Sequence, residues 1–187
     1  EASPRLVEAF RDSSEPLRRA QIAHEWDMGN HVTPLCLADP RYPERLRHCP
    51  DAPLVLYYKG SADLNQAKVI NIVGTRRCTA YGQDIVRRFL TDLKQRCPQV
   101  LVVSGLAYGI DICAHRQALA NGYETVGVLA HGLDDLYPPR HRATAEEMTR
   151  QGGLLTEFMT TTNADKMNFV RRNRIVAGLC DATLLVE

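Results

Sequence analysis

The chain has 187 residues, of which 44% are hydrophobic and 24% are charged. These proportions are typical of a folded globular protein and argue against a disordered chain. Its 23 Lys and Arg residues are balanced by 22 Asp and Glu residues, which leaves a net charge of +1. A general attraction to polyanions is therefore excluded, and any binding of nucleic acid has to come from a local basic patch.

The cysteines and the apolar segments indicate the compartment. The six cysteines form no C-x-x-C pair and have no spacing typical of a zinc site, so we expect reduced thiols, no metal and no cofactor. The absence of a signal peptide and of a long apolar run predicts a cytoplasmic protein. The chain starts at Glu1 and stops in the apolar stretch Leu184 to Glu187, which we interpret as the middle of a buried strand in a longer protein.

Residues 1–50 are predicted to form an accessory segment of helices and loops. Helical patterns occur near Arg5 to Phe10 and from Leu17 to Trp26, and a stretch rich in proline follows them. Proline removes a backbone donor and fixes φ, so this stretch is expected to be loop with at most a short strand, for example Val32 to Leu37. Residues 51–187 are predicted to form the main domain.

In the main domain, short runs rich in Val, Ile and Leu alternate with amphipathic segments of helical length. The expected strands are Leu54 to Tyr58, Val69 to Val73, Val100 to Val103, Thr125 to Leu129, Leu154 to Thr156 and Ala182 to Val186. The expected helices run from an N-cap at Thr79 to just before Pro98, from Ile110 to Ala120, after Pro138-Pro139, and over about 168 to 178. This order predicts an α/β fold, an extended Rossmann-type and mostly parallel sheet with helices on both faces.

Three loops are expected at the carboxyl ends of the strands, where open α/β sheets bind their ligands. The first presents Arg76 and Arg77 beside a glycine turn and a helix start. The second adds a hydroxyl and the ring of Tyr108, and the third begins at Lys166 and leads into a basic helix. The alternative interpretation is that glycine-rich turns of this kind are common in α/β folds whatever they bind.

The basic helix carries Arg171, Arg172 and Arg174 ahead of an apolar run, with no acidic cluster close by in the sequence. A helix N-terminus is already partly positive, so cations in its opening turns favour binding of an outside anion, and phosphate is the obvious candidate. The alternative is a solvated basic face that only keeps the helix in water. Phe169, taken alone, is as consistent with a core position as with base stacking.

Two arginine-bearing turns with an aromatic and a lysine between them converge on one edge of the predicted sheet. Basic residues interleaved with aromatic residues suit a single nucleic-acid strand, whose bases are free to stack. The candidate binding residues are Gly74, Thr75, Arg76, Arg77, Ser104, Gly105, Tyr108, Gly109, Lys166, Asn168, Phe169, Arg171, Arg172, Asn173 and Arg174.

The usual signatures of nucleotide and hydrolytic enzymes are missing from the sequence. It contains no G-x-x-x-x-G-K-[ST], no G-x-G-x-x-G with a downstream acid, no H-E-x-x-H and no G-x-S-x-G. Asp111 is interpreted as complementing the dipole of its own helix, and Asp134-Asp135 as solvated loop acids. We therefore predict no catalytic residues and no enzyme activity.

The order of these loops resembles the DNA-processing protein A family, also called DprA or Smf, over roughly residues 40–187. The matching pieces are Tyr42-Pro43 ahead of Lys59-Gly60, Val73 to Arg77, Val103 to Ala107 with Gly109 to Asp111, Gly132 to Asp134 with Tyr137 to Pro139, and Asn168-Phe169 with Arg172 to Ile175. The resemblance implies a Rossmann-type domain that binds single-stranded DNA, a homodimer in the full-length protein, and loading of the RecA recombinase during natural transformation.

The resemblance also implies roles for single residues. The family's DNA-contacting arginine falls in the Arg76-Arg77 turn, and its K-x-x-F pair falls on Lys166 and Phe169. Tyr108 stands where many members have arginine, and Val170 where many have proline. Two other hypotheses stay open: a nucleotide-processing enzyme like the lysine-decarboxylase-like phosphoribohydrolases, whose P-G-G-x-G-T-x-x-E string is absent here, and a sensor of free nucleotide.

Overall fold

The computed structural model describes residues 3, 7–8, 11 and 13–187. The chain divides into two compact units, Glu1–Thr33 and Pro34–Glu187. The first unit contains α2, Ser14–Gly29, which includes the helix predicted from Leu17. Most of the helix predicted near residues 5–10 lies outside the described residues.

The boundary between the units comes earlier in the chain than the predicted boundary near residue 50. Leu35, Tyr42 and Leu46 are buried in the same hydrophobic cluster as Leu56, which places the proline-rich stretch within the second unit. The hydroxyl of Tyr42 donates to the carbonyl of Pro53 at 2.8 Å and fixes part of this stretch. Composition marked the stretch as irregular backbone, but it did not show which core the apolar side chains join.

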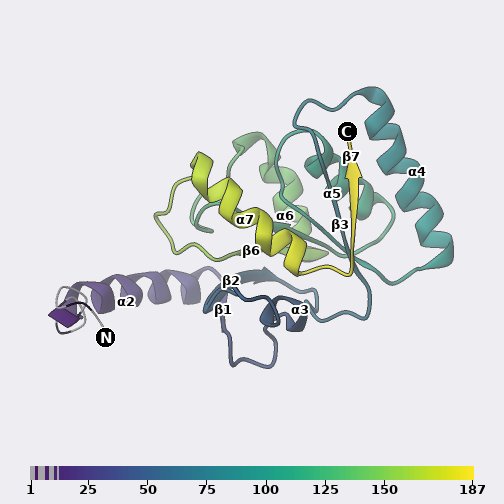
Figure 1. Cartoon of the computed structure of the whole chain (residues 1–187). Helices are drawn as coiled ribbons and strands as arrows, with labels where there is room; N and C mark the ends of the chain where they lie inside the picture. Colours follow the sequence, from purple (N-terminus) through teal and green to yellow (C-terminus); the bar gives the residue numbers. More distant parts are fainter. Residues whose placement is uncertain (1–2, 4–6, 9–10, 12) are drawn as a thin grey trace. The chain divides into compact units, whose positions relative to one another are not determined.

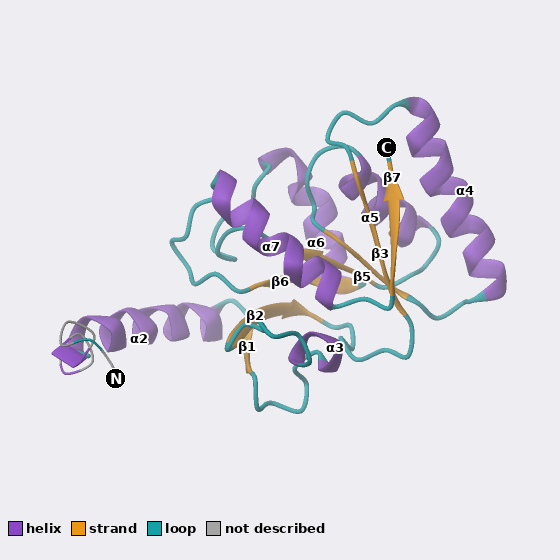
Figure 2. Ribbon diagram, viewed as in Figure 1, coloured by secondary structure: helices purple, strands orange, loops and turns teal. Residues whose placement is uncertain are grey.

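The second unit is organised around a sheet in the order β1-β2-β6-β5-β4-β3-β7 (Figure 2). The strands are β1 (Thr33–Cys36), β2 (Val55–Gly60), β3 (Val69–Gly74), β4 (Leu101–Ser104), β5 (Thr125–Val128), β6 (Gly152–Thr156) and β7 (Ala182–Val186). From β6 to β7 neighbouring strands are parallel, whereas β2 pairs antiparallel with β6. The prediction of a mostly parallel α/β sheet is confirmed.

Helices pack on both faces of the sheet (Figure 1). They are α3 (Glu44–Arg47), α4 (Ala80–Arg96), α5 (Ile110–Ala120), the short 3-10 helix η1 (Pro139–His141), α6 (Arg142–Arg150) and α7 (Lys166–Gly178). Side chains of a strand alternate between faces, so Val102 packs with α4 and α5 whereas Val103 packs with α7. On β6, Leu154 packs with α6 and Leu155 packs on the opposite face.

Local sequence signals determine where the helices begin and end. Thr79 is the N-cap of α4, and its hydroxyl accepts a hydrogen bond from the backbone of Gly82, as predicted. The helix ends at Arg96, before Pro98, and α5 has the predicted bounds. Asp165 caps α7 by accepting from the backbone N–H of Asn168 at 2.8 Å.

The expected strand from Ala182 to Val186 is present as β7, and within this chain it is not buried on both faces. Among the described residues β7 lies at one edge of the sheet and pairs with β3 alone, so Ala182 and Thr183 are exposed and Leu185 keeps 75% of its surface. Val186 is the buried residue of this strand and packs against the α4 and α5 cluster. An apolar sequence indicates a strand but does not indicate its position in the sheet.

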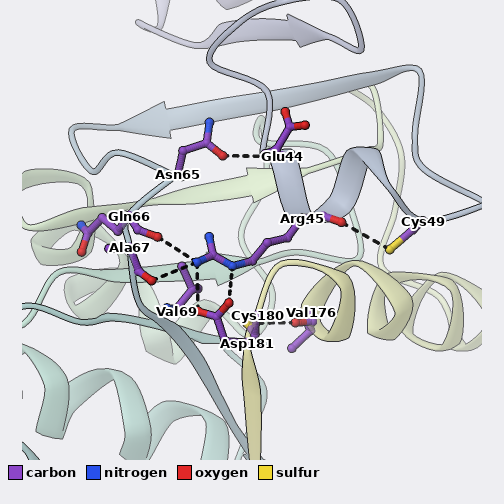
Figure 3. A network of polar contacts seen from close by, with 10 residues as sticks. All are labelled: Glu44, Arg45, Cys49, Asn65, Gln66, Ala67, Val69, Val176, Cys180 and Asp181. Atoms are coloured by element: carbon purple, nitrogen blue, oxygen red, sulfur yellow. Dashed lines mark hydrogen bonds and ion pairs between the residues drawn. The ribbon is translucent and has the colours of Figure 1, made fainter.

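A polar network ties the starts of β3 and β7 to the short helix α3 (Figure 3). Arg45 donates from its Nε to Asp181 at 2.7 Å and from Nη2 to the backbone carbonyl of Gln66 at 3.0 Å. The other carboxylate oxygen of Asp181 accepts from the backbone N–H of Val69 at 2.8 Å. These bonds hold the amino ends of the two strands together, opposite the end where ligands are expected.

Candidate functional site

The order of the strands reverses at β3, because β4, β5 and β6 follow on one side of it and β7 lies on the other. In open α/β sheets, ligands bind at the carboxyl ends of the strands beside such a reversal. A pocket of about 290 Å³ lies here, between the ends of β3 and β4 and the helix α7. We call it the Phe169 pocket; six of the predicted residues line it, namely Gly74, Arg76, Gly105, Phe169, Arg172 and Asn173.

Phe169 is half-buried and its ring is surrounded by polar and aromatic groups. The guanidinium carbon of Arg76 lies 4.9 Å from the ring centroid, and that of Arg172 lies 5.9 Å away. The ring of Tyr137 meets it edge to face at 5.9 Å. Both arginines are within the range of cation–π attraction. Phe169 therefore joins the β3–α4 loop to α7 at the pocket and is not a member of the apolar core.

Arg76 and Arg77 are exposed, and neither forms an ion pair with any residue that the structure describes. The turn that carries them is fixed by its backbone: the carbonyl of Thr75 accepts from the N–H of Ile110 at 3.1 Å. Gly109 has a φ of +79°, and a Cβ there would overlap that same carbonyl. The turn is thus held rigidly while its two guanidinium groups stay available.

Arg172 is only 4% exposed and lies below the pocket surface. Its Nη1 donates to the carbonyl of Val128 at 2.7 Å, and a Cβ on Gly105 would overlap its guanidinium, so a larger residue there would displace Arg172. Burial raises the pKa of the nearby Asp111 carboxyl, and the charge of Arg172 opposes that rise. The expectation that no acid lies near Arg172 is wrong, because Asp111 in the first turn of α5 is close enough for the two charges to influence each other's pKa.

The remaining cations of α7 lie outside the lining of the Phe169 pocket. Arg174 pairs with Glu157 and lies 3.5 Å from the carboxylate of Asp51, so the expectation of no neutralising acid is wrong for this residue too. Lys166 and Arg171 are exposed on the helix surface. The helix begins at Lys166, and this start places Arg172 and Arg174 beyond the opening turn where an anion is favoured.

Two predicted polar residues are occupied inside the protein. Ser104 is fully buried, and its hydroxyl donates to the carbonyl of Ile72 at 2.6 Å. The side-chain amide of Asn168 donates to the carbonyl of Asn163 at 3.1 Å, and this residue is 6% exposed. Both side chains shape the loops around the site from within.

A second pocket, of about 420 Å³, adjoins the first because Arg76 lines both. We call it the Tyr108 pocket; Arg77, Tyr108 and Gly109 also line it. The Tyr108 ring lies 5.2 Å from the ring of His141, edge to face, and the guanidinium of Arg140 lies 5.7 Å from its centroid.

Sequence reasoning missed three residues at these pockets: Arg116, Tyr137 and Arg140. Arg116 lies within the α5 pattern, where it reads as a solvated helix residue. The Tyr137-Pro138-Pro139 string was visible, but its packing on Phe169 depends on tertiary structure. Only the arrangement of the folded loops brings these residues to the site.

No group of His, Cys, Asp or Glu side chains within the described part of the chain is arranged to hold a metal ion. No helix in that part is long and apolar enough to cross a lipid bilayer.

Burial lowers the pKa of His115 to about 3, and this imidazole is fully buried against Thr125, 2.8 Å away. His115 is therefore a neutral core side chain at physiological pH.

Comparison with known proteins gives concordant matches. The family model for DNA recombination-mediator protein A matches residues 33–187. DNA processing protein DprA of Streptococcus pneumoniae is 36% identical over 151 residues, which cover 81% of this chain and 52% of that protein. Protein Smf of Escherichia coli K12 is 37% identical over 186 residues, which cover 97% of this chain and 48% of that protein. The chain spans about half the length of these curated relatives.

Two solved structures share the fold. The X-ray structure of DprA from Streptococcus pneumoniae superposes with a TM-score of 0.79 and 34% identity, over 88% of this chain and 57% of that one. DprA from Helicobacter pylori, described for its unique single-stranded DNA binding mode, superposes with a TM-score of 0.72 and 28% identity, over 82% of this chain and 68% of that one.

Proposed function

The chain belongs to the DNA recombination-mediator protein A family, and on this premise we propose that it binds single-stranded DNA at the Phe169 pocket. The relative from Helicobacter pylori is described as binding single-stranded DNA. The observation that carries the proposal is the arrangement at the pocket, where the guanidinium of Arg76, which is exposed and forms no ion pair with a described residue, lies 4.9 Å from the ring centroid of Phe169.

The chemistry of the pocket suits an unpaired strand. Guanidinium groups match phosphate in a bidentate geometry, and an aromatic ring stacks on any base that is free of a partner. Bases inside a duplex are stacked on each other and cannot reach Phe169.

We assign the contacts to DNA in two groups. Arg76, Arg77, Lys166 and Arg171 are exposed and suit phosphate, whereas Phe169 suits a base. Arg172 supports Phe169 and the floor of the pocket from below. The other predicted residues form the framework or the rim of the proposed site. They are Gly74, Thr75, Ser104, Gly105, Tyr108, Gly109, Asn168, Asn173 and Arg174.

The wider role that we propose is that of a mediator, which protects incoming single strands and loads RecA onto them during natural transformation in the cytoplasm. The family's description as a recombination mediator supports this role. Because relatives are about twice as long, the homodimer and the contact with RecA are proposals for the whole protein. Assembly of RecA on DNA coated with single-strand-binding protein, followed with and without this protein, tests the loading step.

We further propose that the site binds and does not catalyse. Of the described residues that line the Phe169 pocket, Asp111 alone carries a carboxylate, and it is buried beside Arg172. No histidine or cysteine lines this pocket among those residues, which leaves no evident pair of nucleophile and base. Release of a base or phosphate from a mononucleotide incubated with the protein would favour the nucleotide-processing alternative instead.

The decisive experiment is a titration of fluorescent oligo-dT, followed by anisotropy at several salt concentrations. Each phosphate contact to a single strand contributes about 0.7 to the slope of log K against log salt. Replacing Arg76 and Arg77 together by Ala is expected to flatten that slope by about 1.4 if each makes one contact. Duplex DNA and a mononucleotide serve as competing ligands and are expected to bind more weakly.

Arg87 and Arg88 provide the matched control, because both are exposed on α4 but paired with Asp84. Their double replacement by Ala changes the net charge by the same amount as the first pair. We expect it to leave the slope and the affinity close to those of the parent protein. Equal effects of the two double variants would mean that only net charge matters and that the Arg76-Arg77 turn is not part of the site.

A further inference from the structure

The Tyr108 pocket has the composition of an anion site of its own. Arg76, Arg77 and Arg116 line it, and none of the described residues that line it carries a carboxylate. None of the three guanidinium groups forms an ion pair with a described residue. The side chain of Arg116 donates from Nε to the hydroxyl of Thr144 over a long 3.4 Å.

An aromatic ring adjoins these cations. Tyr108 is half-buried and packs edge to face on His141, with Arg140 at 5.7 Å from its ring centroid. Burial lowers the pKa of His141, and the charges of Arg116 and Arg140 lower it further, so both cations lie close to this aromatic pair. A ring held on one edge and surrounded by cations repeats the arrangement of Phe169 and Arg76.

We propose that the Tyr108 pocket is a second nucleotide subsite, which binds the stretch of the same single strand that leaves the Phe169 pocket. Arg77 and Arg116 contact its phosphates, Tyr108 stacks on a base, and Arg140 backs the ring. This inference rests on the proposed function of the first pocket. It extends that function by naming Arg116 and Arg140 as contact and support residues, and by giving the strand a path across the carboxyl edge of β3 and β4.

Two features favour a continuing strand over a free anion. Arg76 lines both pockets, so a phosphate bound by it lies between a base at Phe169 and a base at Tyr108. A free phosphate ion uses the guanidinium groups but gains nothing from the ring. A strand alternates phosphates and bases, and the two pockets present cations and rings in the same alternation.

Oligonucleotide length separates the two subsites. A dT dinucleotide is long enough for the Phe169 pocket alone, whereas a dT hexanucleotide reaches both. Tyr108→Ala is expected to weaken binding of the hexanucleotide about tenfold, which is within the range for one stacked base, and to leave the dinucleotide unaffected. Arg116→Gln is expected to lower the salt slope by about 0.7 for the hexanucleotide only. Arg96→Gln, an exposed change at the far end of α4, is the control.

Cysteine alkylation gives a readout that does not depend on substitutions. Cys78 and Cys113 line the Tyr108 pocket, and Cys36 is exposed elsewhere in the same unit. We expect the hexanucleotide to slow alkylation of Cys78 and Cys113 by N-ethylmaleimide, followed by mass spectrometry, and to leave Cys36 unchanged. Burial raises the pKa of the Cys113 thiol, so the reaction is run at mildly alkaline pH.

The outcomes distinguish this inference from the function on which it rests. If the hexanucleotide binds and Phe169→Ala weakens it, but Tyr108→Ala and Arg116→Gln do not and both cysteines stay reactive, the second subsite is refuted and the first one stands. If neither oligonucleotide binds, the proposed function fails and the second subsite fails with it. Inhibition of alkylation by inorganic phosphate as strong as that by the hexanucleotide would identify a simple anion site instead.

Discussion

The arginines of the β3–α4 loop and those of α7 look alike in the sequence but differ in the folded protein. Arg76 and Arg77 are exposed and have no acidic partner among the described residues. Arg172 is buried against Val128 and near Asp111, and Arg174 is paired with Glu157. A run of arginines therefore does not tell which of them can reach a ligand. Carboxylates and carbonyls from distant segments decide that.

The difference also assigns different jobs to the two groups. A free guanidinium at the surface gains energy mainly when an anion arrives, whereas a buried one contributes to the folded state whether or not a ligand is bound. Loop arginines should therefore control affinity and salt dependence, and the buried arginine should control stability. Substitutions in each group test this division, because affinity and stability are measured separately.

Arg172→Ala is expected to have the largest effect, a loss of about 3 kcal/mol in the free energy of unfolding. The change leaves the carbonyl of Val128 without its donor and the buried carboxyl of Asp111 without its nearby cation. Urea unfolding followed by circular dichroism measures it. Arg171→Ala, an exposed neighbour on α7, is the control and should stay within about 0.5 kcal/mol of the parent. Equal stability of both variants would contradict the structural role of Arg172.

Phe169→Ala is expected to reduce affinity for oligo-dT by about 1–3 kcal/mol, the usual range for one stacked base. The salt slope should not change, because the ring carries no charge. Val170→Ala is the matched control, since Val170 follows it on α7 and is 61% exposed. A fall in the melting temperature with unchanged binding would show instead that Phe169 is a packing residue.

The sequence predicted the elements whose signals are local. Thr79 and Pro98 mark the two ends of α4. The hydroxyl of Thr79 caps the first turn and Pro98 lacks a backbone N–H, and both effects reach only a few residues along the chain. The mostly parallel sheet followed from the alternation of apolar runs and amphipathic segments. The edge position of β7 did not, because strand order depends on how crossovers pack and not on the composition of one strand.

The candidate site was predictable in part for the same reason. Loops at the carboxyl ends of β3 and β4 had to meet, and this brought Arg76 and Gly105 to one pocket. The partner of Arg174 could not be read from its neighbours, because Glu157 follows β6 and joins it only in the folded chain. Arg116 was not predicted, because a helical pattern shows which residues are exposed but not which of them lies beside a loop that comes from another part of the chain.

Comparing Lys166→Ala with Arg174→Ala tests whether exposed cations control DNA binding and paired ones do not, because both residues lie on α7. Lys166 is exposed, so its removal is expected to lower the salt slope for oligo-dT by about 0.7. Arg174 is paired with Glu157 and lies near Asp51, so its removal should leave the slope unchanged. Anisotropy titrations at several salt concentrations give both slopes. A larger change for Arg174→Ala than for Lys166→Ala would mean that DNA displaces the internal partner.

Asp181→Asn is expected to have the smallest effect, a loss in the free energy of unfolding that appears only above the lowered pKa of Asp181. Hydrogen bonds from Arg45 hold the pKa of Asp181 below its ordinary value. A lowered folded-state pKa contributes stability that is present above the unfolded-state pKa and is lost as the pH falls through the folded-state one. Asp181 is half exposed, so screening limits the loss at neutral pH to about 1 kcal/mol or less.

In urea unfolding, the parent and Asp181→Asn should differ at neutral pH and converge below the lowered pKa. DNA binding should be the same for both, because Arg45 and Asp181 lie at the amino ends of β3 and β7, away from both pockets. A difference in stability that persists in acid would assign the effect to the hydrogen bond from the backbone N–H of Val69, because the protonated carboxyl of Asp181 can still accept that bond. A change in the salt slope would mean that a paired arginine remote from the pockets also controls DNA binding, and the division between the two groups of arginines would fail.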